Sequence, residues 1–250
     1  VELNEPHHWG MRDASDVICV VSAYLSAYNA RAFGVKDYIA QLMFNSPPGL
    51  SDALDLAKML AMLDIIEPLA TPDFHIWRQS RTGLLSYPVQ VDEARAHLAA
   101  SVYVQMAVQP HIIHVVSYTE ADHAATADEV IESCRLARRA LENALRGAPD
   151  LTADPRVHAR RAELVQQAQL TLAAIAAIAD RDVSDPLIDP GTLARAVQVG
   201  ILDAPQLRTN RFAPGTIITR CTPEGACIAV DSAERPLREQ ERLAHFLQGA

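Results

Sequence analysis

The chain repeats one local pattern, in which a short apolar segment is followed by a polar loop and an amphipathic helix. The segments expected to form strands are residues 1–5, 38–44, 74–77 and 112–116. The helices expected to follow them span about residues 17–33, 51–69, 92–108 and 126–145. Such alternation favours parallel strands joined by crossover helices. Because polar residues gather in the loops after the strands, we expect a site at the carboxyl ends of the strands.

Local signals add detail to these elements. Residues 6–10 are expected to form a polar loop after the first strand. Ser51 is expected to cap the second helix, and Thr126 with Glu129 predicts a capping box at the start of the fourth. The stripe expected to face the core on the fourth helix consists of Val130, Cys134, Ala137, Leu141 and Leu145.

The number of repeats restricts the fold further. Four strand–helix units make about half of an eight-unit barrel. We therefore expect an α/β fold of the (β/α)8 TIM-barrel type, in which residues 1–146 supply the four units of the C-terminal half. Open sheet edges need a cover, so we expect either a homo-oligomer or completion by another barrel half.

The pattern changes at Gly147. Two helices with proline at the first helical position are predicted to begin at Asp154-Pro155 and Asp189-Pro190. Residues 217–220 and 226–230 predict a small hairpin, and the last residues predict a short surface helix. Residues 147–250 are thus expected to form a helical and hairpin appendage that packs on the same domain.

Composition and charge argue against several classes of function. At a net charge of −9, the chain lacks the basic surface that non-specific nucleic-acid binding requires. No apolar run is long enough to cross a bilayer. The cysteines, at positions 19, 134, 221 and 227, form no CxxC pair, which argues against a zinc site. We expect a cytoplasmic enzyme with reduced thiols.

Glu120 is the first candidate for a catalytic group. It follows the fourth predicted strand and lies beside Tyr118, Thr119 and His123 in the sequence. A carboxylate at a strand end can accept hydrogen bonds from a ribose or an amine, or it can transfer a proton. The alternative is that Glu120 caps the following helix or pairs with an arginine.

Arg78 and Arg81 are candidates for binding an anionic substrate. We expect both in a loop after the third strand, close to Gly83. Paired guanidinium groups bind carboxylates or phosphates through parallel hydrogen bonds. For each arginine the alternative is a solvated or ion-paired side chain. Asn45, in the loop after the second strand, is a weaker candidate for which a structural turn is the simpler role.

The histidines do not form a pattern typical of a metal site. His7 and His8 are adjacent, and His111 and His114 are three apart on a predicted strand, so the members of each pair point to different faces. We expect no metal, although one histidine can act alone in catalysis. The sequence also lacks a Walker loop, a GxGxxG after a strand, HExxH and GxSxG, which excludes the P-loop, Rossmann, zincin and hydrolase-elbow classes.

The region around the fourth strand resembles a known enzyme family. Residues 114–121, His-Val-Val-Ser-Tyr-Thr-Glu-Ala, and residues 125–129, Ala-Thr-Ala-Asp-Glu, are similar to the large catalytic (epsilon) subunit of cobalamin-dependent glutamate mutase, also called methylaspartate mutase. That family carries a Lys-Thr-Pro-His-Glu-Ala run and then a Pro-Thr-Lys-Glu helix start. Its closing segment is similar to residues 200–205, 210–219, Gly225 and 236–237. The resemblance is distant and is strongest over residues 112–126 and 199–243.

The resemblance implies a (β/α)8 barrel whose carboxyl face stacks on the corrin of adenosylcobalamin. It implies an isomerase, either a carbon-skeleton mutase or an aminomutase, that acts by a radical mechanism on a small amino acid of the glutamate or methylaspartate type. In that family a small cobalamin-binding subunit supplies the histidine ligand of cobalt, so such a partner is expected here. The family's glutamate that holds the adenosyl ribose matches Glu120, whereas the family's lysine four residues earlier is replaced by Val116.

The expected site residues form three groups. Catalysis is assigned to Glu120, Arg81 and Tyr118. Cofactor contacts are assigned to Glu120, Thr119, His123, Asn45 and Gly83. Substrate contacts are assigned to Arg78, Arg81, His7 and His8.

Two other functions fit the same sequence. The first is a (β/α)-barrel enzyme without a corrin, such as a lyase or an aldolase-like protein, in which Glu120 and His123 act as acid and base. The second is a non-catalytic half-barrel that serves as a binding or assembly module.

Overall fold

The predicted strands form one parallel sheet. In the computed structural model, β1 (Glu2–Leu3), β2 (Asp37–Phe44), β3 (His75–Thr82) and β4 (Ile112–His114) pair in the order β1-β2-β3-β4, and every pairing is parallel. The structure describes residues 1–3 and 5–247. Asn4, which falls in the predicted first strand, and residues 248–250, which end the predicted appendage, lie outside the described residues. The expectation of a mixed α/β fold with a parallel sheet is confirmed.

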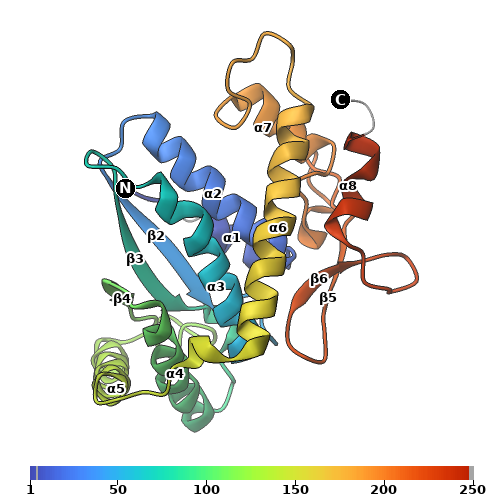
Figure 1. The fold of residues 1–250 in the computed structure, drawn as a ribbon. Helices are drawn as coiled ribbons and strands as arrows, with labels where there is room; N and C mark the ends of the chain where they lie inside the picture. The colour runs from blue at the N-terminus through green and yellow to red at the C-terminus, as the bar shows by residue number, and fades with distance from the viewer. Residues whose placement is uncertain (4, 248–250) are drawn as a thin grey trace.

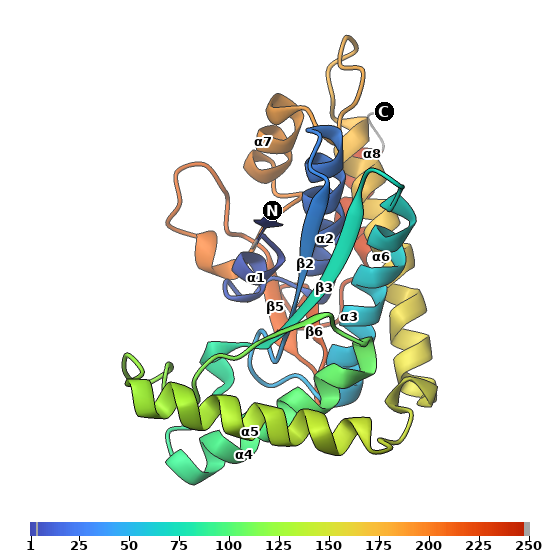
Figure 2. The same cartoon turned by 90° about the vertical axis from the view of Figure 1, so that its left-hand side faces the viewer.

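Helices pack against one face of this sheet, as Figure 1 shows for α2 (Asp16–Ala32) and α3 (Asp52–Ile66). Alternate residues of a strand point to opposite faces, and the helix-facing positions of β2 are apolar and buried. They are Tyr38, Ala40, Leu42 and Phe44. A smaller apolar cluster joins the end of β4 to α4 (Val91–Gln105) and α5 (Ala127–Leu145). The other face of β2 and β3 is turned towards the viewer in Figure 2, and the short helix α1 (Glu5–Gly10) contacts β2 on this side through His7 and Met43.

Several boundaries differ from the sequence-based prediction. The first strand, expected over 1–5, is described as Glu2–Leu3, and the fourth, expected over 112–116, ends at His114. The third strand was expected over 74–77, but β3 continues to Thr82 because its polar residues pair in register with β2 along its whole length. The loop expected at residues 6–10 is instead the short helix α1 (Glu5–Gly10). The described residues also include five short 3-10 helices: Glu67–Leu69, Leu84–Ser86, Met106–Val108, Leu151–Ala153 and Pro205–Leu207.

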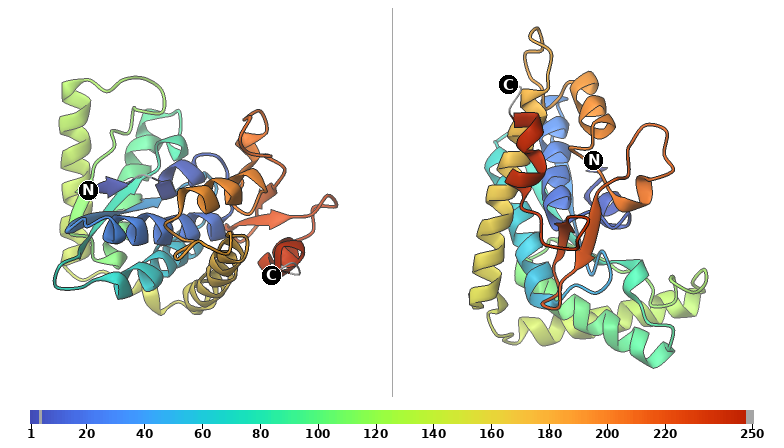
Figure 3. Two further views of the ribbon diagram at one scale, coloured as in Figure 1. Left: turned by 90° about the horizontal axis from the view of Figure 1, so that it is seen from above. Right: turned by 90° about the vertical axis from the view of Figure 1, so that its right-hand side faces the viewer.

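The C-terminal segment packs on the outside of the helical layer. The long helix α6 (Pro155–Ala177) contacts α2 and α3, and α7 (Pro190–Gln198) and α8 (Glu239–Leu247) follow it. The predicted hairpin is formed by β5 (Ile218–Cys221) and β6 (Cys227–Val230) and is seen in the right-hand view of Figure 3. Gly225 at its tip accepts a 3.0 Å hydrogen bond from the Ser51 N–H, and a Cβ there would lie 2.3 Å from that nitrogen. Among the described residues, no helix is both long and apolar enough to span a membrane.

Helix α5 begins at the predicted capping box, in which Thr126 Oγ1 accepts from the Glu129 N–H and the Glu129 carboxylate accepts from the Thr126 N–H. We expect Thr126→Ala to lower the free energy of unfolding by about 1 kcal/mol, because the first turn loses its side-chain acceptor. Urea unfolding measures this loss. Thr126→Ser, which keeps the hydroxyl, is expected to cost less, and an equal loss in both variants would contradict the capping explanation.

The predicted core stripe of α5 was wrong. Of Val130, Cys134, Ala137, Leu141 and Leu145, only Ala137 is fully buried, and Leu145 is 70% exposed. The buried residues are the small ones, Ser133, Ala137, Ala140 and Ala144. Small side chains allow α5 to pack closely on α4. The contact between the two helices therefore determines which face of α5 is buried, and the positions of its largest apolar residues do not.

Candidate functional site

The strand register arranges the open face of the sheet in rows. In the row nearest the carboxyl ends, Met43, Arg81 and His114 lie side by side on β2, β3 and β4. The row before it holds Gln41, Gln79 and Ile112. Ionisable side chains of this face are therefore concentrated at the carboxyl end, where parallel α/β folds place their chemistry.

The row of amides is held by a carboxylate from the edge strand. Glu2 Oε1 accepts a 2.7 Å hydrogen bond from Gln41 Nε2 and another of 2.7 Å from Gln79 Nε2. Both glutamines are buried, and these bonds supply partners for their donors. Sequence analysis missed all three residues, although a glutamine inside the otherwise apolar β2 is a signal of a polar sheet face.

Arg81 is the central cation of this face. Its Nε is buried without a hydrogen-bond partner, and no carboxylate among residues 1–3 and 5–247 forms an ion pair with its guanidinium group. Burial lowers the pKa of Arg81, while the negative charges of Glu120 and Glu2 act against that shift. An arginine remains protonated despite such a shift. Arg81 therefore carries a positive charge, and its guanidinium N–H donors form no hydrogen bond with the described residues.

His7 lies next to this cation on α1. Its Nδ1 contacts the sulfur of Met43, and its side chain is buried. Burial, and after it the positive charge of Arg81, lower the pKa of His7 to about 4. His114 is affected likewise, since burial and then Arg81 lower its pKa. Both imidazoles are therefore neutral at pH 7.

The neutral state of His7 makes stability depend on pH. Its pKa is about 4 in the folded protein, below the value of about 6.5 in an unfolded chain. The unfolded state therefore binds more protons below pH 6.5, and stability is lost as the pH falls towards 4. We expect His7→Gln to lose less stability than the wild type when the urea midpoint is measured at pH 7.5 and again at pH 5. His8→Gln, at the exposed neighbour, should follow the wild type, and parallel curves for all three proteins would refute the prediction.

Glu120 faces this group from the turn after β4. Its Oε1 accepts a 3.2 Å hydrogen bond from the Ser117 N–H, and its side chain is exposed. It does not cap α5, because Thr126 does. Its charge acts on Arg81, His114 and Tyr87. Tyr87 is a further residue that sequence analysis missed; it is buried, and its hydroxyl donates to the Val116 carbonyl at 3.1 Å.

Two predicted residues point away from this group. Arg78 and Arg81 were expected in one loop, but both lie in β3, where residues three apart face opposite sides. Arg78 lies on the helix side and pairs with Glu67, its Nε donating at 2.8 Å. Tyr118 is buried on the same side, where its hydroxyl donates to Glu132 at 2.6 Å.

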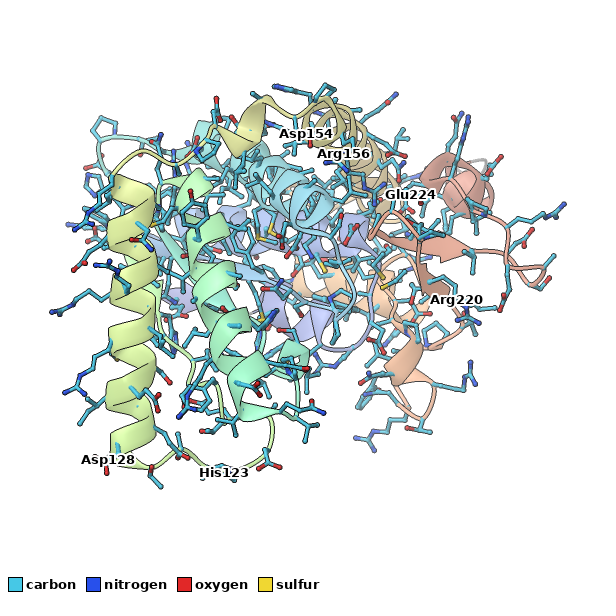
Figure 4. All side chains as sticks on the ribbon, turned by 90° about the horizontal axis from the view of Figure 1, so that it is seen from below. His123, Asp128, Asp154, Arg156, Arg220 and Glu224 are labelled. Atoms are coloured by element: carbon cyan, nitrogen blue, oxygen red, sulfur yellow. The ribbon has the colours of Figure 1, made fainter. Side chains whose placement is uncertain are left out.

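Four more predicted residues have structural contacts instead. Asn45 adopts a φ of +58° and accepts a 2.7 Å hydrogen bond from Ser101. Thr119 is buried and bonds Ser117. A Cβ on Gly83 would lie 2.9 Å from the Asn45 carbonyl oxygen, so the ends of β2 and β3 require glycine there. His123 pairs with Asp122 and Glu129 at the rim of the molecule, far from Arg220 and Glu224 of the hairpin (Figure 4).

A buried ionic cluster supports the loop after β2. Lys58 Nζ lies 2.9 Å from Asp55 Oδ1 and 3.7 Å from Asp16 Oδ1, and it donates to the Ser46 carbonyl at 2.7 Å. Arg160 of α6 binds the other oxygen of Asp16 at 2.9 Å. Burial lowers the pKa of Lys58, but the carboxylates of Asp55 and Asp16 outweigh it and raise that pKa overall. The cluster therefore ties α2, α3 and α6 to the strand-end loop.

Within the part of the chain that the structure describes, no group of three or more histidine, cysteine or acidic side chains is placed to hold a metal ion. Comparison with models of known protein families and with curated proteins finds no match to this chain. The geometry of the site is therefore the basis for any assignment of function.

Proposed function

We propose that the carboxyl end of the sheet binds the carboxylate of a small acidic substrate through Arg81. The observation that carries this proposal is the buried, unpartnered Nε of a cation at the row nearest the strand ends. A guanidinium group binds a carboxylate through two parallel hydrogen bonds. The ring nitrogens of His7 and His114 would lie beside the bound anion.

We also propose that the four strands are half of a (β/α)8 barrel. The sequential strand order supports this, because right-handed crossovers between consecutive neighbours place their helices on one face. A doubly wound sheet would instead reverse its strand order at a switch point. On this proposal the polar rows are the barrel interior, and the edges of β1 and β4 are completed by a second half.

Within such a barrel, the resemblance to glutamate mutase favours a carbon-skeleton mutase or aminomutase that uses adenosylcobalamin and a small cobalamin-binding subunit. Glu120 fits the adenosyl ribose, because the Ser117 N–H engages only Oε1 and the side chain is exposed. Thr119, Asn45 and His123 fit less well, since each has a structural partner. When bound, the cofactor would supply the radical that abstracts hydrogen. The chain's own residues would bind the substrate carboxylate at Arg81 and hold the ribose at Glu120.

Equilibrium dialysis with adenosylcobalamin tests the cofactor proposal, and cyanocobalamin is the matched control because it has the same corrin without the adenosyl group. We expect adenosylcobalamin to bind more tightly, and Glu120→Gln to remove most of that difference. With the small subunit added, glutamate should rearrange to methylaspartate, which proton NMR detects. Equal binding of the two cobalamins would contradict the proposal.

The second candidate is a barrel lyase without a corrin. It would use His7 as the proton acceptor, because the imidazole is neutral at pH 7 and a carboxylate bound beside it at Arg81 would raise its pKa from about 4 towards the working pH. The acid–base pair first expected, Glu120 with His123, is less suited, since His123 is held at the surface by two carboxylates. Activity that does not depend on adenosylcobalamin and is lost in His7→Gln would select this candidate.

A further inference from the structure

The hairpin brings two cysteines together at the edge of a cavity. In the β5–β6 register, Cys221 lies directly opposite Cys227. The next pair towards the tip is hydrogen-bonded, with the Thr222 N–H donating to the Ala226 carbonyl at 2.8 Å. Bonded and non-bonded pairs alternate in an antiparallel ladder, so the two cysteines occupy a non-hydrogen-bonded position. The Cys227 N–H accordingly points away from β5 and donates to Asp16 at 3.1 Å.

This position matches the geometry of a disulfide. Cα atoms of a non-hydrogen-bonded pair are about 4.5 Å apart, within the range of roughly 4.4–6.8 Å that a disulfide requires. Both thiols are free in the structure. Each instead points to a backbone carbonyl, Cys221 to that of Pro48 and Cys227 to that of Ala14, at 3.5 Å in both cases.

The two cysteines also differ in their exposure to solvent. Cys221 is exposed and Cys227 is buried, and both line a cavity of about 380 Å³ together with Pro48, Arg208 and Arg220. The hydrogen bond between the two side chains lowers the pKa of Cys221 to about 7, and the same bond together with burial raises the pKa of Cys227. An accessible thiolate next to a protected thiol is the arrangement of an attacking and a resolving cysteine.

We propose that Cys221 and Cys227 form a redox-active dithiol that closes to a cross-strand disulfide by exchange with a low-molecular-weight disulfide such as oxidised glutathione. The Cys221 thiolate attacks one sulfur of the small disulfide, whose S–S bond breaks and releases one thiolate. Cys227 then loses its proton and attacks Cys221 Sγ, which releases the second thiol. The protein loses two electrons and two protons, and the small disulfide is reduced to two thiols.

The chain contains its own controls. Cys19 is buried, and burial raises its thiol pKa to about 12, so it should not react. Cys134 is exposed on α5, which lies at the opposite end of the molecule from the hairpin in the left-hand view of Figure 3. It should form at most a mixed disulfide with glutathione, because no second thiol can resolve it.

The test treats the reduced protein with oxidised glutathione at pH 7, blocks free thiols with iodoacetamide, and maps peptides by mass spectrometry. A trypsin fragment that begins at Cys221 contains both cysteines, and we expect it to become two hydrogen atoms lighter and to resist alkylation. In Cys227→Ser, Cys221 should instead retain glutathione, and in Cys221→Ser the buried Cys227 should stay reduced. A wild-type fragment that is alkylated at both cysteines, or that keeps glutathione on Cys221, would overturn the proposal.

Discussion

Arg81→Met is expected to weaken the binding of a small dicarboxylate such as glutarate by about 10- to 100-fold. The change removes charge-assisted hydrogen bonds that each contribute about 1.5–3 kcal/mol, and every 1.4 kcal/mol corresponds to a factor of about ten. Methionine keeps much of the length of the side chain, and the guanidinium it replaces has a buried Nε without a partner. The loss of affinity should therefore not be accompanied by a large loss of stability. Isothermal titration calorimetry measures the affinity, and thermal unfolding measures the stability.

Arg78→Met is the matched control for this experiment. Arg78 lies three residues away in the same strand but faces the helices, where it pairs with Glu67 and donates to the Val108 carbonyl at 2.9 Å. The Arg78→Met variant should have a lower unfolding temperature than the wild type. Its glutarate affinity should stay within about twofold of the wild type, a difference of only about 0.4 kcal/mol. Equal losses of glutarate affinity in the two variants would show that binding of the anion does not depend on the open face of the sheet.

Lys58→Met is expected to lower the free energy of unfolding by about 3–5 kcal/mol, the largest effect on stability of any change considered. Removing one partner of a buried ion pair leaves the other charge without compensation. Asp55 would lose its cation, whereas Asp16 would keep Arg160. The Ser46 carbonyl would also lose the ammonium donor that holds the strand-end loop. Urea unfolding at pH 7, followed by circular dichroism, gives the difference directly.

Lys36→Met provides the control, because Lys36 is the only other lysine in the sequence and its side chain is exposed. Surface substitutions of this kind change stability by about 0.5 kcal/mol or less. If Lys58→Met cost no more than Lys36→Met, the buried cluster would not be what holds α2, α3 and the loop together.

Local sequence signals predicted most of the elements because each depends on nearby residues. Ser51 and Thr126 cap helices as expected, and proline after Asp154 and Asp189 begins two more. The end of β3 was missed because Arg78-Gln79-Ser80-Arg81 resembles a loop when each residue is considered alone. It forms a strand because one of its faces meets the helices and the other is the polar face of the sheet, which depends on residues far away in the sequence.

The sequence located site residues only where they lie at, or directly after, the end of a strand. Glu120 and His7 are each close enough to Arg81 for their ionisation to interact with its charge. Tyr118 was assigned to the site, but its side chain lies against α5, where the hydroxyl donates to Glu132. Glu2 and Gln41 could not be paired without the register of β1 against β2, which only the folded sheet supplies.

The central claim is that Arg81 makes the carboxyl end of this sheet a carboxylate site, and titration of the wild-type protein with glutarate and with its neutral diamide, glutaramide, tests it most directly. The two ligands share a carbon skeleton and differ in charge. We expect glutarate to bind with one equivalent per chain, added salt to weaken that binding, and glutaramide to give no measurable heat of binding. Equal binding of the two ligands, or no binding of glutarate, would contradict the central claim.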